Sequence, residues 1–360
     1  KDEVKLFMKT VRFGIVGYGF MGYEHYKMLH NFPNAAITAI CDRNPEQLKD
    51  VPNGVRAYEQ AEDLFADSNV DVVILSANNN QHCKLVCQAA QAGKDIICEK
   101  PVAMTLAELD QMERAVKEAG VKFTVHQQRR FDPDFRTTKN VVESGTLGRI
   151  YTIKSSLYGY NGNMHDWHVY KSEGGGMLYD WGVHLIDQIL WMIDSPVKSV
   201  YADVRDVINQ EVDDYFHIIL RFYNGLTADI ELGTYYLSTK PDWFERHWYV
   251  GGDKGVMELD GLHPKGNIVR TAHLLTEVGK KRATGDGGPT RSFGTPEPGL
   301  ILTEPLPIAN TEHADYFRNY IAAWNGEAEF LVKIDEVRRS LRLMDAARES
   351  AKTGFAVSFE

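Results

Sequence analysis

The stretch YDWGVHLIDQ, residues 179–188, carries three polar side chains that could take part in proton transfer. Asp180, His184 and Asp187 are four and three residues apart, so on an α-helix they would lie along one stripe. A histidine suits general acid–base chemistry because the unperturbed pKa of imidazole, about 6.5, lies near neutrality. The same residues also suit a capped helix with a buried, hydrogen-bonded histidine. If the stretch is half of a site, the other half must lie elsewhere in the chain.

A second candidate group is Lys100, in the segment CEKP at residues 98–101. The residues before it, DIICE at 95–99, are predicted to form a short strand. The lysine would then lie at the carboxyl end of a strand, where doubly wound sheets bind ligands. Pro101 disfavours helical geometry at Lys100 and keeps it extended. Glu99 and Lys100 could instead be a surface pair on a loop, and the spacing alone fits both interpretations.

The segment GIVGYGFMG places Gly17, Gly19 and Gly22 in the pattern G-x-G-x-x-G, between a predicted strand and a predicted helix. The first glycine allows a tight turn, the second lets the backbone approach a pyrophosphate, and the third lets the helix pack on the strand. The helix N-terminus would supply N–H groups and a partial positive charge to the phosphates. This pattern therefore predicts dinucleotide binding.

The nicotinamide cofactor is predicted to be NAD rather than NADP. Asp42 ends the second predicted strand, twenty residues after Gly22, where the ribose hydroxyls would lie. Its carboxylate would repel the 2′-phosphate of NADP. Arg43 could bind that phosphate or stack on the adenine, so NADP is the less favoured alternative.

The elements that position these groups alternate regularly in the first part of the chain. Predicted helices, including one from about 80 to 92 that ends at Gly93 and one over 105–119 that ends at Gly120, separate buried strands. The predicted strands cover residues 11–17, 36–41, 71–77, 95–99 and 122–127. This order predicts a doubly wound, Rossmann-type parallel sheet, and we assign the dinucleotide-binding domain to residues 1–127.

The rhythm changes in residues 128–360, which we assign to a substrate-binding and oligomerisation domain. FHIILRFYNGLTADIELG has Asn-Gly between two apolar runs, a strong hairpin signal, and HWYVGGDKGVMELD has a similar form. We expect antiparallel sheet and hence an α+β domain, with a long loop at 279–300 and helices at about 311–325 and 334–353. The last helix could pack back on the first domain.

Composition excludes several classes of function. The chain has 360 residues, 43% of them apolar, and a formal net charge of −10, so nucleic acid and anionic membrane surfaces are poor partners. No stretch approaches twenty apolar residues and no signal peptide is evident, so we expect a cytoplasmic protein. The four cysteines are expected to be buried free thiols. The histidines form no evident metal-binding cluster.

Taken together, the motifs resemble the Gfo/Idh/MocA family, which includes glucose–fructose oxidoreductase and inositol dehydrogenase. The likeness extends over nearly the whole chain. The matching segments are GIVGYGFMG (14–22), CDR (41–43), NNNQH (78–82), AGKDIICEKPVAMT (92–105), QRRFDPDF (128–135), GGGMLYDWGVHLIDQILWM (174–192) and RLMDAARESAKTG (342–354).

The resemblance implies an oxidoreductase that moves a hydride between NAD(H) and a secondary hydroxyl or keto group of a sugar, sugar derivative or cyclitol. It implies that the second domain has a large, open, mostly antiparallel sheet. It also implies that Lys100, Asp180 and His184 meet at the nicotinamide. His184 would be the base, Asp180 would orient it or share in the proton path, and Lys100 would bind the reacting oxygen. Asp187 is expected to have a supporting role. The implied cofactor-binding residues are Gly17, Gly19, Phe20, Met21, Gly22, Asp42, Arg43, Ala77, Asn79, His82, Glu99, Lys100 and Gln128.

One segment departs from the family pattern, because Ala77-Asn78-Asn79 replaces the usual Thr-Pro-Asn ahead of His82. Asn79 and His82 remain in step with the family pattern.

The substrate pocket is predicted from aromatic and polar residues that precede the 179–188 stretch. The substrate-binding set is Lys100, Tyr158, Trp167, His168, Asp180 and His184, and Tyr160 and Asp166 could add to the wall. The aromatic residues could equally belong to a core. Arg129 and Arg130 could bind a carboxylate or the cofactor, or form salt bridges.

The aromatic strand WFERHWYV, residues 243–250, is expected to pack against a sister subunit in a homodimer or homotetramer. Two alternative functions remain open. The first is NAD-dependent cleavage of a glycoside through a 3-keto sugar, and the second is a non-catalytic dinucleotide-binding regulator.

Overall fold

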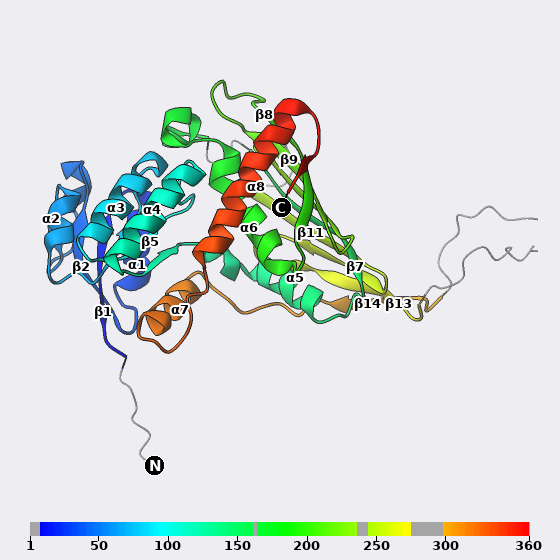
Figure 1. Ribbon diagram of the computed structural model, residues 1–360. Coiled ribbons are helices and arrows are strands. Elements are labelled where there is room, and N and C mark those ends of the chain that lie inside the picture. The colour runs from blue at the N-terminus through cyan, green and yellow to red at the C-terminus, as the bar shows by residue number, and fades with distance from the viewer. Residues whose placement is uncertain (1–7, 161–163, 236–243, 275–297, 360) are drawn as a thin grey trace, which may run out of the picture.

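The structure is a computed structural model that describes residues 8–160, 164–235, 244–274 and 298–359 (Figure 1). These residues form a six-stranded sheet followed by a nine-stranded sheet, each with helices packed against it. The predicted 279–300 loop falls largely outside the described residues. Figure 1 shows the two sheets side by side, with α8 running between them.

The first sheet is parallel throughout, with the strand order β3-β2-β1-β4-β5-β6. Its apolar strands are buried on both faces, as a doubly wound sheet requires. The predicted Rossmann sheet is thereby confirmed. The strands are β1 (Val11–Val16), β2 (Ala35–Cys41), β3 (Arg56–Tyr58), β4 (Val72–Leu75), β5 (Asp95–Cys98) and β6 (Phe123–Val125).

The order of the strands reverses between β1 and β4, so this is the point where ligands bind in open α/β sheets. Two helices begin close to it. The helices of this part are α1 (Phe20–Leu29), α2 (Ala61–Ala66), α3 (His82–Gln91) and α4 (Leu106–Ala119), with short 3-10 turns η1 (Pro45–Leu48) and η2 (Asn79–Gln81). Gly93 and Gly120 have positive φ of 72° and 68° just after α3 and α4, as expected of helix ends.

The sequence did not indicate β3. After residue 41 it suggested one polar helix, whereas the chain forms η1, the edge strand β3 and the short helix α2. β3 is only three residues long, and its Arg56 and Ala57 are exposed. An edge strand of this kind has no buried apolar run, so hydrophobic patterning does not reveal it.

The second sheet is mostly antiparallel, with the order β14-β13-β12-β11-β7-β10-β9-β8-β15 and one parallel pair, β7 with β10. Both predicted hairpins are present as β9–β10 and β11–β12, and Gly225 of the first has φ 87°. The strands are β7 (Ile150–Gly159), β8 (Val197–Arg205), β9 (Tyr215–Phe222), β10 (Thr227–Gly233), β11 (Phe244–Gly252), β12 (Gly255–Asp260), β13 (Lys265–Thr271), β14 (Ile301–Pro305) and β15 (Val357–Ser358).

Three helices cover one face of this sheet: α5 (Pro133–Glu143), α6 (Val183–Met192) and α8 (Ile334–Thr353). On β11, Arg246 and Trp248 point to this face and are buried, and both side chains bond to Asp134 of α5. His247 and Tyr249 alternate with them on the outer face and are only partly buried.

Helices α7 (Ala314–Trp324) and α8 also contact the first sheet. The hydroxyl of Tyr316, on α7, donates to the carbonyl of Val125 at 3.0 Å. Arg338, on α8, forms ion pairs of 2.7 Å with Asp110 and with Glu113, both on α4. None of the helices in the described ranges has the length and apolarity needed to cross a membrane. The four cysteines are free thiols. Cys41 and Cys98 are buried as expected, whereas Cys83 and Cys87, both on α3, are only partly buried.

Candidate active site

Lys100 follows β5 by two residues and points toward the second half of the chain. Its Nζ donates to Oδ1 of Asp180 at 2.7 Å and to the backbone carbonyl of Asp180 at 2.9 Å. The Lys100 side chain is 13% exposed and that of Asp180 is 4% exposed. Within the described ranges the third N–H of the ammonium has no protein partner. Lys100 can therefore donate it to a bound molecule.

Asp180 lies in a π-helical turn, Leu178–Gly182, which continues directly into α6. The start of this turn is held by Asp213, whose Oδ2 accepts from the N–H of Leu178 at 2.6 Å. Burial raises the pKa of the Asp213 carboxyl to about 6. In the wider π turn, the side chains of residues 178–182 point in different directions from those in the regular α-helix that the sequence suggested.

His184, in the first turn of α6, is buried beside the ion pair. Its Nδ1 lies 3.0 Å from Oε1 of Gln127, and because an amide oxygen only accepts, this contact assigns the proton to Nδ1. Nε2 then carries the lone pair. Burial holds the pKa of His184 well below its usual value, and the positive charges of Lys100 and Arg129 lower it further. A neutral imidazole with a free lone pair is the form that a general base needs.

Asp187 contributes to structure. Its two oxygens accept a bidentate pair of hydrogen bonds from Arg130, both at 2.7 Å. Arg130 also bonds to Glu336 of α8 at 2.8 Å, so it ties α6, α8 and the 3-10 turn at Gln128–Phe131 together. Arg129 pairs with Asp132 at 3.0 Å and stacks on Trp181. Both arginines thus form salt bridges within the protein.

Of the residues predicted to form the substrate wall, His168 and Trp167 lie beside Asp180. Nε2 of His168 is 3.8 Å from Oδ2 of Asp180, and the ring of Trp167 stacks on His168 with a centroid distance of 3.8 Å. Burial lowers the pKa of His168. Both residues belong to the short turn Asp166–Val169, in which Asp166 has φ 49° and an exposed side chain.

The structure places Tyr158 elsewhere. It lies on the outer face of the second sheet, where its hydroxyl donates to Glu231 at 2.7 Å and its ring is 5.9 Å from that of His247. Leu157, the preceding residue, is the one that points toward the helices. Tyr160 is 70% exposed.

A cavity of about 420 Å³ lies at the carboxyl ends of β1, β2 and β4, where a dinucleotide was predicted. Gly17 has φ 91°, and a Cβ there would lie 2.6 Å from the carbonyl oxygen of Ser76. Gly19 has open space around it, and no side chain caps the first turn of α1. The free amides and the open approach fit a pyrophosphate. The predicted residues that line this cavity are Gly17, Gly19, Asp42, Arg43 and Ala77.

Asp42 is fixed at the cavity by two backbone contacts. Its Oδ2 accepts from the N–H of Tyr18 at 2.7 Å, and its Oδ1 accepts from the N–H of Asn44 at 2.8 Å. The carboxylate therefore links the glycine-rich turn to the end of β2. A fixed negative charge lies where the adenosine ribose was expected.

The remaining predicted cofactor residues are absent from the lining of this cavity. Phe20 is 79% exposed, Met21 lies next to it in the first turn of α1, and Gly22 packs directly on the carbonyl of Gly17. His82 is fully buried, with Nδ1 2.9 Å from the carbonyl of Pro101 and Nε2 2.9 Å from that of Ala77. It thereby joins the ends of β4 and β5.

Three consecutive asparagines, the segment that departs from the family pattern, join the two halves of the site. Nδ2 of Asn78 donates to Glu173 at 2.7 Å, Nδ2 of Asn79 to the carbonyl of Gly174 at 3.0 Å, and Nδ2 of Asn80 to the carbonyl of Ser172 at 3.2 Å. Residues 78–80 thus bind residues 172–174, just ahead of the π turn. We call this set of contacts the asparagine seam.

Glu99 points away from Lys100 into the interior of the first sheet. Its Oε1 lies 2.8 Å from Nε2 of His25 and 2.7 Å from Nδ1 of His126. This is the single metal-type grouping found among the described residues, and its donor atoms are hydrogen-bonded to one another. Gln128, also buried, has an Oε1 without a partner in the same part of the structure.

Sequence reasoning missed Gln127, His25 and His126. A signal for two of them was present, because His126 and Gln127 directly follow β6 at the carboxyl edge of the parallel sheet. His25 lies inside α1 with no neighbour in sequence that marks it. Asp213 likewise gave no signal, since its role depends on the fold of the second domain.

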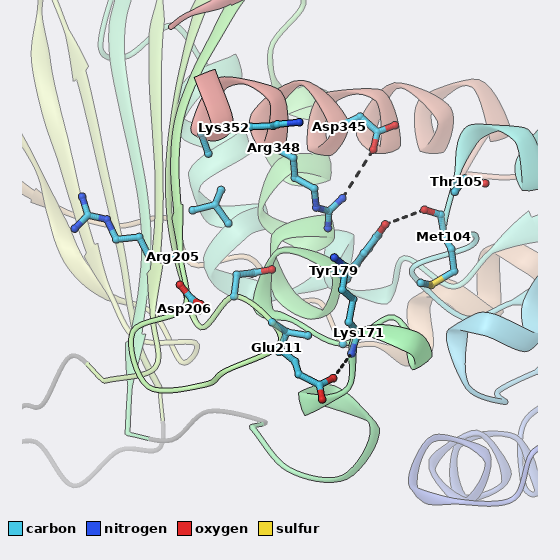
Figure 2. Close-up of a pocket in the computed structure, with 15 residues that line it drawn as sticks. Met104, Thr105, Lys171, Tyr179, Arg205, Asp206, Glu211, Asp345, Arg348 and Lys352 are labelled. Carbon is cyan, nitrogen blue, oxygen red and sulfur yellow. Dashed lines mark hydrogen bonds and ion pairs between the residues drawn. The ribbon is translucent and has the colours of Figure 1, made fainter. Parts of the chain in front are cut away.

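A second cavity of about 670 Å³ is lined by Tyr179, the residue before Asp180, and by residues of α8 (Figure 2). Figure 2 shows the hydroxyl of Tyr179 directed at the carbonyl of Met104, a hydrogen bond of 2.8 Å. The guanidinium of Arg348 lies 4.1 Å from the centre of the Tyr179 ring. Tyr179 precedes Asp180, so one short segment forms a wall of this cavity and carries part of the site.

Comparison with known proteins agrees with this geometry. Residues 11–127 match the family model described as "Oxidoreductase family, NAD-binding Rossmann fold", and residues 135–258 match the "GFO/IDH/MocA C-terminal domain". The chain is 29% identical over 357 residues to scyllo-inositol 2-dehydrogenase (NADP(+)) IolW of Bacillus subtilis, covering 98% of this chain and 96% of that protein.

Two solved structures are similar over the whole fold. An NAD-binding protein from Listeria innocua has a TM-score of 0.83 at 33% identity, covering 97% of each chain. The WlbA dehydrogenase of Bordetella pertussis, in complex with NADH and UDP-GlcNAcA, has a TM-score of 0.77 at 25% identity, covering 98% of this chain and 99% of that one. The chain is therefore an NAD(P)-binding oxidoreductase that belongs to the Gfo/Idh/MocA family.

Proposed function

We propose that this protein is a dehydrogenase or reductase that interconverts a secondary alcohol and a ketone on a sugar, sugar derivative or cyclitol. The observation that carries the proposal is the contact between Lys100 and Asp180, with His184 buried beside it. These residues meet at the carboxyl end of β5, on the same edge of the sheet as the dinucleotide cavity.

Each residue has a defined part in alcohol oxidation. Nε2 of His184 accepts the hydroxyl proton, because the contact with Gln127 leaves its lone pair free. Lys100 donates its third N–H to the oxygen and stabilises the negative charge that develops there. Asp180 fixes the ammonium through two contacts. A bound nicotinamide supplies the hydride acceptor or donor. In the reductive direction His184 returns the proton.

A carbohydrate or cyclitol suits the wall next to Asp180. The stacked Trp167 and His168 offer an apolar face and polar ring nitrogens, which suit the two kinds of surface on a sugar ring. The relatives support this class, since one is named for scyllo-inositol and another was solved with UDP-GlcNAcA. With Tyr158 on the outer face of the sheet, the proposed wall consists of His168 and Trp167.

We propose NAD as the preferred cofactor. The support is Asp42, whose carboxylate is fixed at the cavity by two backbone N–H groups and cannot turn away easily from a 2′-phosphate. Arg43 and Lys84 also line the cavity and supply positive charge, and the relative IolW is named as an NADP(+) enzyme. Parallel assays with both cofactors decide the preference.

We also propose that the outer face of the second sheet forms a homo-oligomer interface, as the strand 243–250 suggested. Aromatic rings of Tyr158, Tyr201, Tyr215 and Tyr249 lie on this half-buried face, and such residues are enriched in interfaces. Sedimentation of the purified chain tests this, and a monomer at micromolar concentration would contradict it.

The decisive experiment is a screen of sugars, cyclitols and glycosides with NAD and NADP in parallel, monitored by the absorbance of the reduced cofactor. Oxidation of an alcohol that is lost in both Lys100→Met and His184→Asn supports the proposal. Steady glycoside cleavage without net reduction of cofactor would favour a redox-assisted cleavage instead. Tight cofactor binding without any turnover would favour a regulator, and either result overturns the proposal.

A further inference from the structure

Three buried ionisable residues lie directly behind the proposed catalytic lysine. His25 and His126 have no exposed surface, and Glu99 is 4% exposed. They come from α1, the end of β6 and the end of β5, and the two imidazole rings pack edge to face with centroids 4.5 Å apart. Phe317 and Tyr316 of α7 enclose the rings. We call these three residues the His–Glu–His cluster.

The contacts of the cluster determine where its protons are. Both histidines direct a nitrogen at the same oxygen of Glu99, Nε2 of His25 at 2.8 Å and Nδ1 of His126 at 2.7 Å. A carboxylate oxygen accepts, so each of these nitrogens carries a proton. The opposite nitrogens, Nδ1 of His25 and Nε2 of His126, have no partner among the described residues.

Only one charge state satisfies this arrangement. A second proton on either histidine would place a buried N–H donor where no acceptor lies, which is costly. A proton on Oε1 of Glu99 would face the N–H groups of both histidines, so donors would meet donors at that oxygen. The cluster therefore holds two neutral histidines and one carboxylate, with a net charge of −1. Burial lowers the pKa of His126 to about 4, in agreement with a neutral ring.

The other oxygen of Glu99 bonds to the reactive segment. Oε2 accepts from the backbone N–H of Lys100 at 3.1 Å. The same carboxylate is thus fixed by two histidines on one side and fixes the lysine's backbone on the other. The carbonyl of Pro101, the next residue, lies 2.9 Å from Nδ1 of the buried His82. The backbone N–H of Lys100 and the carbonyl of the residue after it are thus both bonded to buried side chains.

We propose that the His–Glu–His cluster is a built-in anion of fixed charge that positions Lys100 and sets the electrostatic field of the site, and this inference rests on the proposed function. Glu99, His25 and His126 touch neither substrate nor cofactor in this scheme, so they are positioning residues. Sequence alone had assigned Glu99 to the cofactor. In the structure its carboxylate lies on the interior side of the backbone that carries Lys100.

The charge acts on His184 together with the other ionisable groups around it. These are Lys100 after β5, Asp180 in the π turn, Arg129 and Asp132 around the Gln128–Phe131 turn, and His168 and His313 from the flanking segments. Lys100 and Arg129 lower the pKa of His184, whereas Glu99 raises it. Removing the charge of Glu99 without changing its shape should lower the pKa of His184 further.

The first test needs no turnover. Nitrogen NMR of ¹⁵N-histidine-labelled protein, with His25 and His126 assigned from single His→Asn variants, reports which nitrogen is protonated. We expect a proton on Nε2 of His25 and on Nδ1 of His126, because both nitrogens face the same carboxylate oxygen. The ring of His126 should stay neutral down to about pH 5.5, because burial lowers its pKa to about 4. An imidazolium at either position would refute the proposal that the cluster carries a fixed charge of −1. A stoichiometric metal ion, found by elemental analysis of the purified protein, would refute it too.

The second test uses Glu99→Gln, which keeps the shape and removes the charge. We expect kcat to fall about 10- to 100-fold, because small displacements of a reacting group have effects of that size, with little change in the Kd of the cofactor. The acid limb of kcat/KM should move to lower pH. A merely structural role would reduce activity without moving that limb.

Glu108→Gln is the matched control. Glu108 also bonds to the backbone after Lys100, through the N–H of Met104 at 2.7 Å, but it lies outside the cluster. We expect its activity and pH profile to stay close to those of the wild type. An unmoved acid limb in a folded Glu99→Gln protein that binds cofactor would refute the positioning role. If no substrate turns over at all, the proposed function fails, while the NMR result still decides the charge state.

Discussion

Replacing Lys100 by methionine should affect stability and activity in separable ways. Methionine keeps the length of the side chain and removes the ammonium. The buried carboxylate of Asp180 then loses its ion pair at 2.7 Å, and the backbone carbonyl of Asp180 loses a charged hydrogen bond at 2.9 Å. Hydrogen bonds to charged groups contribute about 1.5–3 kcal/mol each, and breaking a buried ion pair costs about 3–5 kcal/mol. His168, 3.8 Å from Asp180, can take up part of the uncompensated charge. We therefore expect a loss near the lower end, about 3 kcal/mol.

Activity should fall by more than this loss of stability explains. Removing a donor that stabilises a developing oxyanion typically lowers kcat about 10²- to 10³-fold, and Lys100 is the donor with a free N–H beside Asp180. The double variant Lys100→Met/Asp180→Asn removes both charges. It should regain most of the lost unfolding free energy, because the carboxylate that the ammonium neutralises is removed together with the ammonium, and it should remain as inactive as the single variant.

The assay is denaturant unfolding and steady-state kinetics of the two single variants and the double variant. A double variant no more stable than Lys100→Met would refute the argument that Asp180 is a buried, compensated charge. A Lys100→Met protein that keeps about a tenth or more of the wild-type kcat would refute the role of the ammonium in the reaction.

Three further predictions follow from the ionisable groups. The pKa of His184 lies well below 6.5, so the base stays neutral on acidification and the acid limb of kcat/KM should lie well below that value; an acid limb near 6.5 or above would contradict this. Asp42→Ser should raise kcat/KM with NADP relative to NAD, measured as the ratio of the two, because it removes the charge next to the 2′-position; an unchanged ratio would exclude Asp42 as the determinant. Burial raises the pKa of Asp213 from 3.8 to about 6, so ionisation of this carboxyl opposes folding. As pH rises from about 4 to about 6, Asp213 should remove about 3 kcal/mol from the free energy of unfolding. The Asp213→Asn protein should therefore be more stable than the wild type at pH 8 but not at pH 4. If the wild type and Asp213→Asn show the same pH dependence in urea unfolding, the prediction for Asp213 is refuted.

The parallel sheet and the cofactor edge could be predicted because their signals are local. The apolar runs of β1 and β4, Gly17 before α1, and Asp42 after β2 are each readable within a few residues. The placement of Lys100 followed from the end of a strand and from Pro101. The Asn224-Gly225 turn likewise determined the β9–β10 hairpin.

The parts that could not be predicted depend on contacts between distant segments. Glu99 and Lys100 are neighbours in sequence but point to opposite sides, and only the meeting of α1 with β6 shows where the carboxylate goes. Tyr158 and Leu157 differ by one residue and lie on opposite faces, because the side-chain period of a strand is two. Which face meets the site is decided by where α6 packs, and no pattern within β7 carries that information.

The asparagine seam has a consequence for how the protein can move. The side chains of residues 78–80 hold residues 172–174 immediately before the π turn, so the segment that carries Asp180 and His184 is tethered to the part of the chain that carries Lys100. We expect opening and closing around a substrate to leave this joint intact, with the hinge falling elsewhere in the chain. Catalytic geometry would then survive the motion, and a glycine in place of Asn79 would make reaction rates sensitive to solvent viscosity and temperature.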